Sequence, residues 1–138
     1  MPKVLIVDDS ATMRKIIMRA LTESGISDLE FAEGGDGAEG LEILSKGGID
    51  LILSDVNMPN MDGIQFVTCV RDQKALETSA VGDKELIKRV ANTIPIVMIT
   101  TEGGLEKVQE ALEAGANDYI KKPFTPEQLR EKLTPFVS

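Results

Sequence analysis

Residues 4–10 read VLIVDDS, an apolar and β-branched run that ends in two aspartates. A short run of this kind, bounded by polar residues, is typical of a strand that is buried on both faces of a parallel sheet. Similar runs occur at residues 51–53 (LIL) and 96–99 (IVMI), and weaker ones at 29–32 (LEFA) and 119–120 (YI). The sequence therefore predicts five strands.

Helical patterns separate these runs. Apolar residues recur at helical spacing most clearly at Met13, Ile16, Ile17, Ala20 and Leu21. A Thr-x-x-Gln capping box at residues 125–128 marks the start of the last helix. Because strands and helices alternate five times, we expect right-handed crossovers and an α/β fold. We predict a flavodoxin-like, doubly wound, five-stranded parallel sheet in the order 2-1-3-4-5, with five helices.

The third crossover is unusually long. The distance in sequence from Leu53 to Val97 is about twice that between the other neighbouring strands, and the excess lies within residues 71–94. Residues 83–91 of this excess have a helical pattern with a capping aspartate at the start. We expect one domain over residues 1–138, with an insertion within residues 71–94 that is partly helical.

Composition excludes several classes of function. The chain has 15 Lys and Arg against 23 Asp and Glu, a net charge of −8, which argues against a nucleic-acid partner and favours bound cations. It has no histidine, which excludes Ser-His catalysis and His-ligated metals. The single cysteine, Cys69, stands among apolar residues and is expected to be buried. No run is long enough for membrane insertion, and we expect a cytoplasmic protein.

Acidic, hydroxyl and basic residues stand directly at the ends of the predicted strands. Asp8 and Asp9 follow the first strand and Asp55 ends the third. Open parallel sheets bind ligands at the carboxyl ends of their strands, so all three carboxylates would face one crevice. Their mutual repulsion would be relieved by a hard cation such as Mg²⁺. Thr100 and Lys122, after the fourth and fifth strands, add a hydroxyl and an ammonium suited to a phosphoryl group.

Four motifs together resemble a known family. They are VLIVDDS at 4–10, SDVNMPNMDG at 54–63, Thr100, and KPF at 122–124. In this order and spacing they resemble the receiver domain of two-component response regulators, and most nearly the single-domain, CheY-like chemotaxis type. The resemblance implies a switch rather than an enzyme, one that catalyses its own phosphorylation and dephosphorylation.

The resemblance assigns roles at the acidic site. Asp55 corresponds to the phosphoacceptor, which takes a phosphoryl group from a histidine kinase. Asp8, Asp9 and Asp55 correspond to the carboxylates that hold Mg²⁺, with the backbone carbonyl of Asn57 as a further ligand. Asn57 and Glu102 match positions that modulate dephosphorylation, for which a phosphatase is a candidate partner.

The resemblance also assigns a switch. Lys122 corresponds to the lysine that contacts the phosphoryl group, with a cis peptide bond to Pro123. Thr100 and Tyr119 match the hydroxyl and aromatic residues that move on phosphorylation. The downstream target is then expected on the surface of the fourth helix, the fifth strand and the fifth helix; a flagellar motor switch protein is one candidate.

Other interpretations remain open at this point. Asp9 and Ser10 are also common helix caps, and Tyr119 is equally well explained as core filling. The same fold could serve as a phosphorylation-independent scaffold. A phosphohydrolase of the haloacid dehalogenase type also forms an aspartyl phosphate, but it normally has a second aspartate two positions after the nucleophile, where this chain has Asn57.

Overall fold

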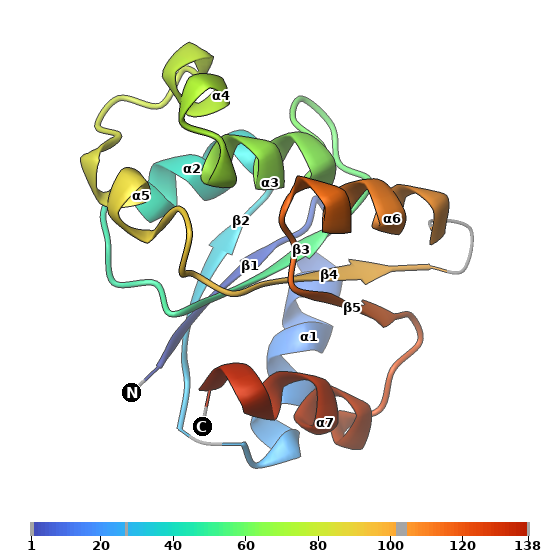
Figure 1. The fold of residues 1–138 in the computed structure, drawn as a ribbon. Helices are drawn as coiled ribbons and strands as arrows, with labels where there is room; N and C mark the ends of the chain where they lie inside the picture. The colour runs from blue at the N-terminus through green and yellow to red at the C-terminus, as the bar shows by residue number, and fades with distance from the viewer. Residues whose placement is uncertain (1, 27, 102–104, 138) are drawn as a thin grey trace.

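A five-stranded parallel sheet forms the centre of the protein (Figure 1). The computed structural model describes residues 2–26, 28–101 and 105–137. The strand order is β2-β1-β3-β4-β5 and every neighbouring pair is parallel, which confirms the predicted topology. The strands are β1 (Lys3–Val7), β2 (Glu30–Gly34), β3 (Leu51–Asp55), β4 (Ile96–Thr100) and β5 (Asp118–Lys121).

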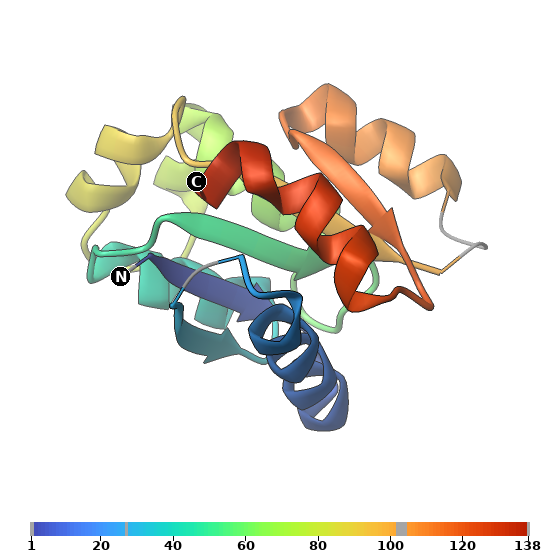
Figure 2. The ribbon, with the colours of Figure 1, turned by 90° about the horizontal axis from the view of Figure 1, so that it is seen from below.

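Helices cover both faces of the sheet. Helices α1 and α7 lie on one face and the remaining helices on the other, as Figures 1 and 2 show. None of the helices in the described part of the chain is long and apolar enough to span a lipid bilayer. The helices are α1 (Ala11–Ser24), α2 (Gly37–Ser45), α3 (Gly63–Arg71), α4 (Gln73–Thr78), α5 (Glu85–Val90), α6 (Leu105–Ala114) and α7 (Pro126–Val137).

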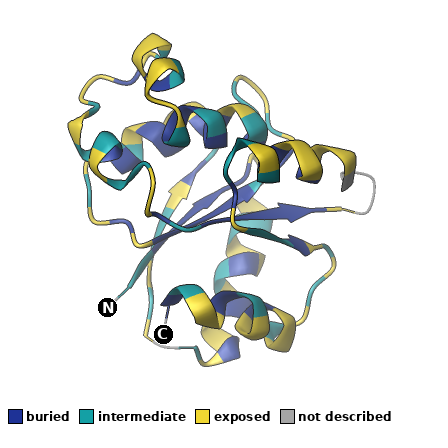
Figure 3. Cartoon of the chain, in the orientation of Figure 1, coloured by how far each residue is buried: buried dark blue, intermediate teal, exposed yellow. Residues whose placement is uncertain are grey.

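The side chains of the central strands alternate between two apolar cores. In β1, Val4 and Ile6 pack with α1 and α7, whereas Leu5 and Val7 pack into the cluster that holds α2 and α3. Figure 3 shows the resulting burial of the strands beneath half-exposed helices. Cys69 lies in the second cluster with 8% exposure, which confirms its prediction as a buried apolar residue. Strand β2 is an edge strand with an exposed side, which explains its weaker apolar pattern.

The third crossover holds three helices, so residues 2–26, 28–101 and 105–137 contain seven helices rather than the five that we predicted. The predicted helical segment is α5. Its N-cap is Lys84 rather than the predicted Asp83, although Asp83 Oδ1, one residue further out, accepts from the amide of Glu85 over 3.1 Å. Helix α4 was not predicted. It spans only six residues and buries a single one, Leu76, so its sequence has no repeating apolar stripe. Lys88 of α5 and Glu77 of α4 form an ion pair at 3.0 Å that joins the two short helices.

The predicted capping box begins the last helix. The amide of Gln128 donates to Thr125 Oγ1 over 3.2 Å, and the amide of Thr125 donates to Gln128 Oε1 over 2.8 Å. This reciprocal pair satisfies two amides that the helix itself leaves unpaired. It therefore fixes where α7 departs from the segment that follows β5.

Candidate phosphoryl-transfer and metal site

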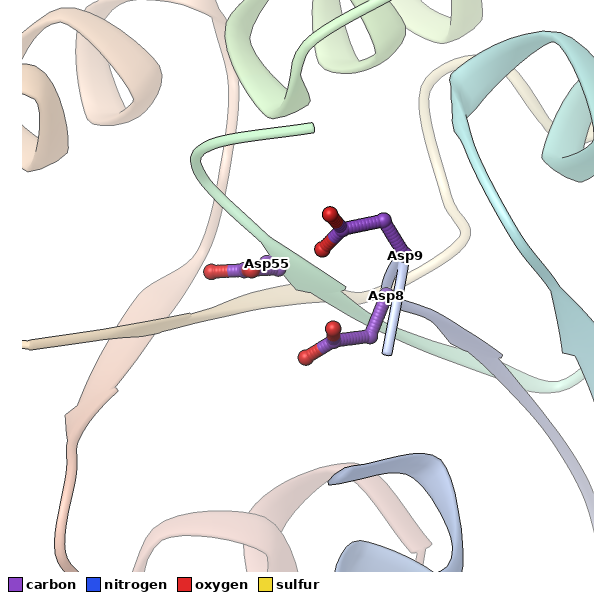
Figure 4. Close-up of side chains that lie close together, drawn as sticks. All are labelled: Asp8, Asp9 and Asp55. Carbon is purple, nitrogen blue, oxygen red and sulfur yellow. The ribbon is translucent and has the colours of Figure 1, made fainter. Parts of the chain in front are cut away.

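Three carboxylates meet at the carboxyl edge of the sheet. Strands β1 and β3 are neighbours with Val7 opposite Ser54, so the residues that follow, Asp8 and Asp55, lie side by side. Together with Asp9 they offer one oxygen each within 4.8 Å of one another. Figure 4 shows the three side chains gathered at this edge of the sheet. The sheet order thus assembles residues that are nearly fifty positions apart in the sequence. The predicted clustering of the acidic residues is confirmed.

Lys122 brings an ammonium group to two of these carboxylates. Its Nζ lies 3.5 Å from Asp8 Oδ2 and 3.6 Å from Asp55 Oδ1, and its side chain is only 15% exposed. The peptide bond between Lys122 and Pro123 is cis, as the resemblance implied. One ammonium beside three carboxylates leaves the site with an excess of negative charge. A compact cationic ligand would compensate that excess.

Burial of the Asp8 and Asp55 carboxylates makes their excess negative charge unfavourable for the folded protein. Asp8 is 2% exposed; its Oδ1 accepts from the amide of Ser10 over 2.9 Å, while Oδ2 accepts no hydrogen bond from any described residue. Burial raises the pKa of the Asp55 carboxyl above its ordinary value; Lys122 opposes this, and the charges of Asp8 and Asp9 add to it. Asp8 Oδ2 is thus paired only at ion-pair distance with Lys122, and a buried oxygen with no hydrogen bond, in a cluster of oxygen ligands, fits a hard divalent cation such as Mg²⁺.

Ser10 and Asp9 have separate roles. Ser10 caps α1, because its Oγ accepts from the amide of Met13 over 3.1 Å. The interpretation of Ser10 as a helix cap is therefore correct. Asp9 is exposed, and its carboxylate belongs to the cluster with Asp8 and Asp55.

Arg14 is part of the site and was not predicted. Its Nη1 donates to the backbone carbonyl of Asp8 over 2.5 Å, and its Nε contacts Glu33 Oε1 at 3.0 Å. It therefore ties the turn after β1 to the edge strand β2. In the sequence it is one basic residue on an amphipathic helix. Only the placement of β2 beside β1 reveals the partner that orients it.

Thr100 ends β4 at the carboxyl edge of the sheet, whereas Tyr119 lies near the start of β5, opposite Met98. Thr100 is 1% exposed, and its Oγ1 donates to the carbonyl of Thr101 over 3.0 Å. Tyr119 is half-buried against the apolar core, and Lys132 Nζ lies 5.2 Å from the centre of its ring. Lys132 Nζ also lies 3.2 Å from Asp118 Oδ1. Both interpretations of Tyr119, core residue and moving aromatic, are compatible with this position.

Asn57 lies in the loop that follows Asp55. It is exposed, and its Oδ1 accepts from Lys107 Nζ of α6 over 2.8 Å. The side chain thereby connects the loop after β3 to the helix after β4. Glu102, the other residue expected to influence dephosphorylation, lies outside the described residues.

Comparison with known proteins identifies the family. The family model for the response regulator receiver domain matches residues 4–82 and 84–134. The chain belongs to the response regulator receiver family. Receivers take part in two-component signalling, where they interact with histidine kinases and with downstream targets. They are generally switches rather than enzymes, and they bind Mg²⁺ through acidic residues.

Individual relatives cover nearly the whole receiver. The chemotaxis protein CheY homolog of Campylobacter jejuni is 43% identical over 132 residues, covering 95% of this chain and 88% of that protein. Chemotaxis protein CheY1 of Helicobacter pylori is 42% identical and covered to 93%. Among solved structures, chemotaxis protein CheY4 of Vibrio cholerae superposes with a TM-score of 0.76 at 38% identity, covering 99% of this chain and 98% of that chain. A putative response regulator of Chloroflexus aurantiacus has a TM-score of 0.79 at 29% identity and the same coverage.

Proposed function

We propose that this receiver is a phosphorylation switch in which Asp55 accepts a phosphoryl group from a histidine kinase in a Mg²⁺-dependent reaction. The observation that supports this most directly is the packing of Asp8, Asp9 and Asp55 within 4.8 Å, with Lys122 Nζ 3.6 Å from Asp55. Asp8 Oδ2 adds support, because this buried oxygen accepts no hydrogen bond from the described residues and has Lys122 Nζ only at 3.5 Å, which leaves it able to bind a metal ion.

In the transfer step, a carboxylate oxygen of Asp55 attacks the phosphorus of the kinase phosphohistidine. The new bond joins that oxygen to phosphorus, the bond from phosphorus to the imidazole nitrogen breaks, and the nitrogen keeps the electron pair. Lys122, already beside Asp55, would neutralise charge on the phosphoryl oxygens. Water later hydrolyses the acyl phosphate, which returns Asp55 to its carboxylate. In this step Asn57 and Glu102 would influence the attack of water.

The carboxylates of Asp8, Asp9 and Asp55 and the backbone carbonyl of Asn57 would hold the metal ion. When bound, Mg²⁺ supplies charge neutralisation for the equatorial phosphoryl oxygens. The chain's own residues then have distinct tasks: Asp55 is the nucleophile, and Asp8 and Asp9 carry the charge that selects a divalent cation.

The switch would begin at Thr100. Its hydroxyl now donates to the carbonyl of Thr101, and a phosphoryl oxygen on Asp55 would offer a stronger, charged acceptor. Movement of Thr100 would allow Tyr119 to turn inward. The affected surface is that of α6, β5 and α7, the last three elements of the fold. A cavity of about 670 Å³ lies at this surface, lined by residues that include Tyr119, Lys122 and Lys132.

The downstream target would bind this surface of α6, β5 and α7. The relatives named as chemotaxis proteins support a role in chemotaxis, with a flagellar motor switch protein as the candidate target. Co-purification from a cell extract, with and without a beryllofluoride mimic of the phosphoryl group, tests this. The mimic should enrich a partner, and Lys132→Glu should remove the enrichment. Equal capture with and without the mimic would contradict a phosphorylation-dependent target.

Mass spectrometry after incubation with Mg²⁺ and acetyl phosphate tests the phosphoacceptor. We expect one phosphoryl adduct, absent in Asp55→Asn and retained in Asp50→Asn, which neutralises an exposed carboxylate at the opposite end of β3. No adduct on the wild-type protein would support the scaffold. Continuous turnover of a free phosphomonoester would support the phosphohydrolase instead.

A further inference from the structure

The loop between Asp55 and α3 is held at its base by its own contacts. The amide of Gly63 donates to the carbonyl of Val56 over 2.8 Å. Asp62 caps α3 in a reciprocal pair with Gln65. These bonds define where the loop of residues 56–62 (site loop) leaves β3 and enters α3. They do not reach its apex.

The apex of the site loop is held by the start of α2. Asn60 stands at φ 64, in the left-handed region, and its Nδ2 donates to Asp36 Oδ2 over 2.8 Å. The amide of Gly37 donates to the carbonyl of Met61 over 3.1 Å. A Cβ on Gly37 would lie 2.7 Å from Met61 Cγ, so the absence of a side chain permits this close approach. Two elements distant in sequence thereby meet beside the acidic site.

Asp36 serves both partners at once. Its Oδ1 accepts from the amide of Glu39 over 2.9 Å, which caps α2, and its Oδ2 accepts from Asn60. The residue is 9% exposed. The hydrogen bond from Asn60, followed by the backbone bond from Glu39, holds the pKa of Asp36 below its ordinary value. A charged acceptor makes both bonds stronger than neutral ones.

We propose that Asp36 is a positioning residue for the metal site, acting through Asn60 to hold the site loop and with it the backbone of Asn57. This rests on the proposed function, in which the Asn57 carbonyl is a metal ligand. Asp36 itself contacts no reacting group. Its contribution is to reduce further the conformations open to the site loop, which Lys107 also contacts through Asn57 Oδ1, before the metal binds.

Asn60→Gly separates this role from simple helix capping. Glycine adopts the left-handed conformation without strain, so the loop backbone is kept while the amide is lost. The cap from Asp36 Oδ1 to α2 is left in place. A matched pair of cap deletions adds a second comparison: Asp36→Ala removes a cap and the tie to the loop, whereas Asp72→Ala removes only the cap of α4.

The test combines a metal titration with a measurement on the metal-free protein. By calorimetry, the Mg²⁺ dissociation constant should rise about fivefold in Asn60→Gly and in Asp36→Ala, the usual effect of one hydrogen bond, and stay unchanged in Asp72→Ala. In metal-free Asn60→Gly, exchange of the Gly37 amide should accelerate severalfold, because its acceptor is on the released loop.

The outcomes distinguish this role from the proposed function. If the wild-type protein binds Mg²⁺ and Asn60→Gly binds it equally well, the positioning role is overturned and the proposed function stands. Equal loss of affinity in Asp36→Ala and Asp72→Ala would likewise reduce Asp36 to a helix cap. If the wild-type protein itself binds no Mg²⁺, the proposed function fails and the positioning role fails with it.

Discussion

The acidic site should destabilise the metal-free protein, and Asp55→Asn should relieve that cost. One oxygen of each carboxylate lies within 4.8 Å of the others, and two unit charges at that distance repel by about 3.5 kcal/mol at an effective dielectric constant of about 20. Asp55 has two such neighbours, Asp8 and Asp9. Lys122 at 3.6 Å returns about 4.6 kcal/mol of attraction. Burial of the Asp55 carboxylate, the largest cause of its raised pKa, adds a desolvation cost to this balance, whereas screening of the exposed Asp9 reduces its repulsion. We therefore expect a net gain of about 1 to 3 kcal/mol in the variant.

The pH dependence gives the sign of the effect. Burial raises the pKa of Asp55 in the folded state above its ordinary value of 3.8. Below that ordinary value the carboxyl is protonated in both the folded and the unfolded state, so it costs nothing. As the pH rises through the raised folded pKa, the unfolded state loses its proton more readily and the wild-type protein loses stability. The advantage of Asp55→Asn should therefore be absent near pH 3 and grow as the pH rises from 3.8 through the raised folded pKa.

Thermal unfolding in the presence of a chelator measures this difference. A gain of 1 to 3 kcal/mol should raise the Tm by about 4 to 12 °C for a domain of this size. Asparagine can still accept the bond that the Val56 amide donates to Asp55 Oδ1 over 2.8 Å, so no contact is lost there. Glu42→Gln, which removes one exposed carboxylate from α2, controls for net charge and should change stability by less than about 0.5 kcal/mol. An unchanged Tm at pH 7, or the same gain at pH 3, would refute the reasoning.

Three further substitutions test separate parts of the structure. Arg14→Lys keeps the charge but loses the contacts of the guanidinium with Asp8 and Glu33. The Mg²⁺ dissociation constant measured by calorimetry should therefore rise about fivefold. The control Arg19→Lys, on the exposed face of α1, should leave the constant unchanged. Gly63→Ala places a Cβ 2.2 Å from the carbonyl oxygen of Asp55, so the free energy of unfolding measured in urea should fall by about 1 to 3 kcal/mol. The control Gly82→Ala, whose Cβ would have no atom within 4 Å, should leave that free energy unchanged. Ile87→Ala in α5 should cost about 2 to 5 kcal/mol, because this fully buried side chain belongs to the core; a cost near zero would show that the short helix contributes nothing to stability.

Much of the fold followed from short-range patterns. A parallel strand buried on both faces needs an uninterrupted apolar run, and β1, β3 and β4 have one, so their positions and the alternation with helices could be predicted. Helix α4 could not, because six residues with one buried anchor carry no period. Its formation depends on the cap from Asp72 and on a core surface that other elements provide.

The acidic cluster and its lysine were predictable for a related reason. Parallel strands all present their carboxyl ends at one edge, so polar residues placed directly after each strand must converge there. For Asp8, Asp55 and Lys122 the structure confirms this convergence, with the lysine within 3.6 Å of both carboxylates. Their chemical roles in phosphorylation remain proposals to be tested as described above.

The residues at the carboxyl edge could therefore be identified without coordinates, since strand position alone carries them there. How they are held depends on contacts that form only when distant segments pack together. The contacts of Arg14 with Asp8 and Glu33, and of Asp36 with Asn60, join segments that are unrelated in sequence. Such contacts have no local signature, because they depend on which strand lies at the edge of the sheet and on how closely one loop can approach a glycine at the start of a helix.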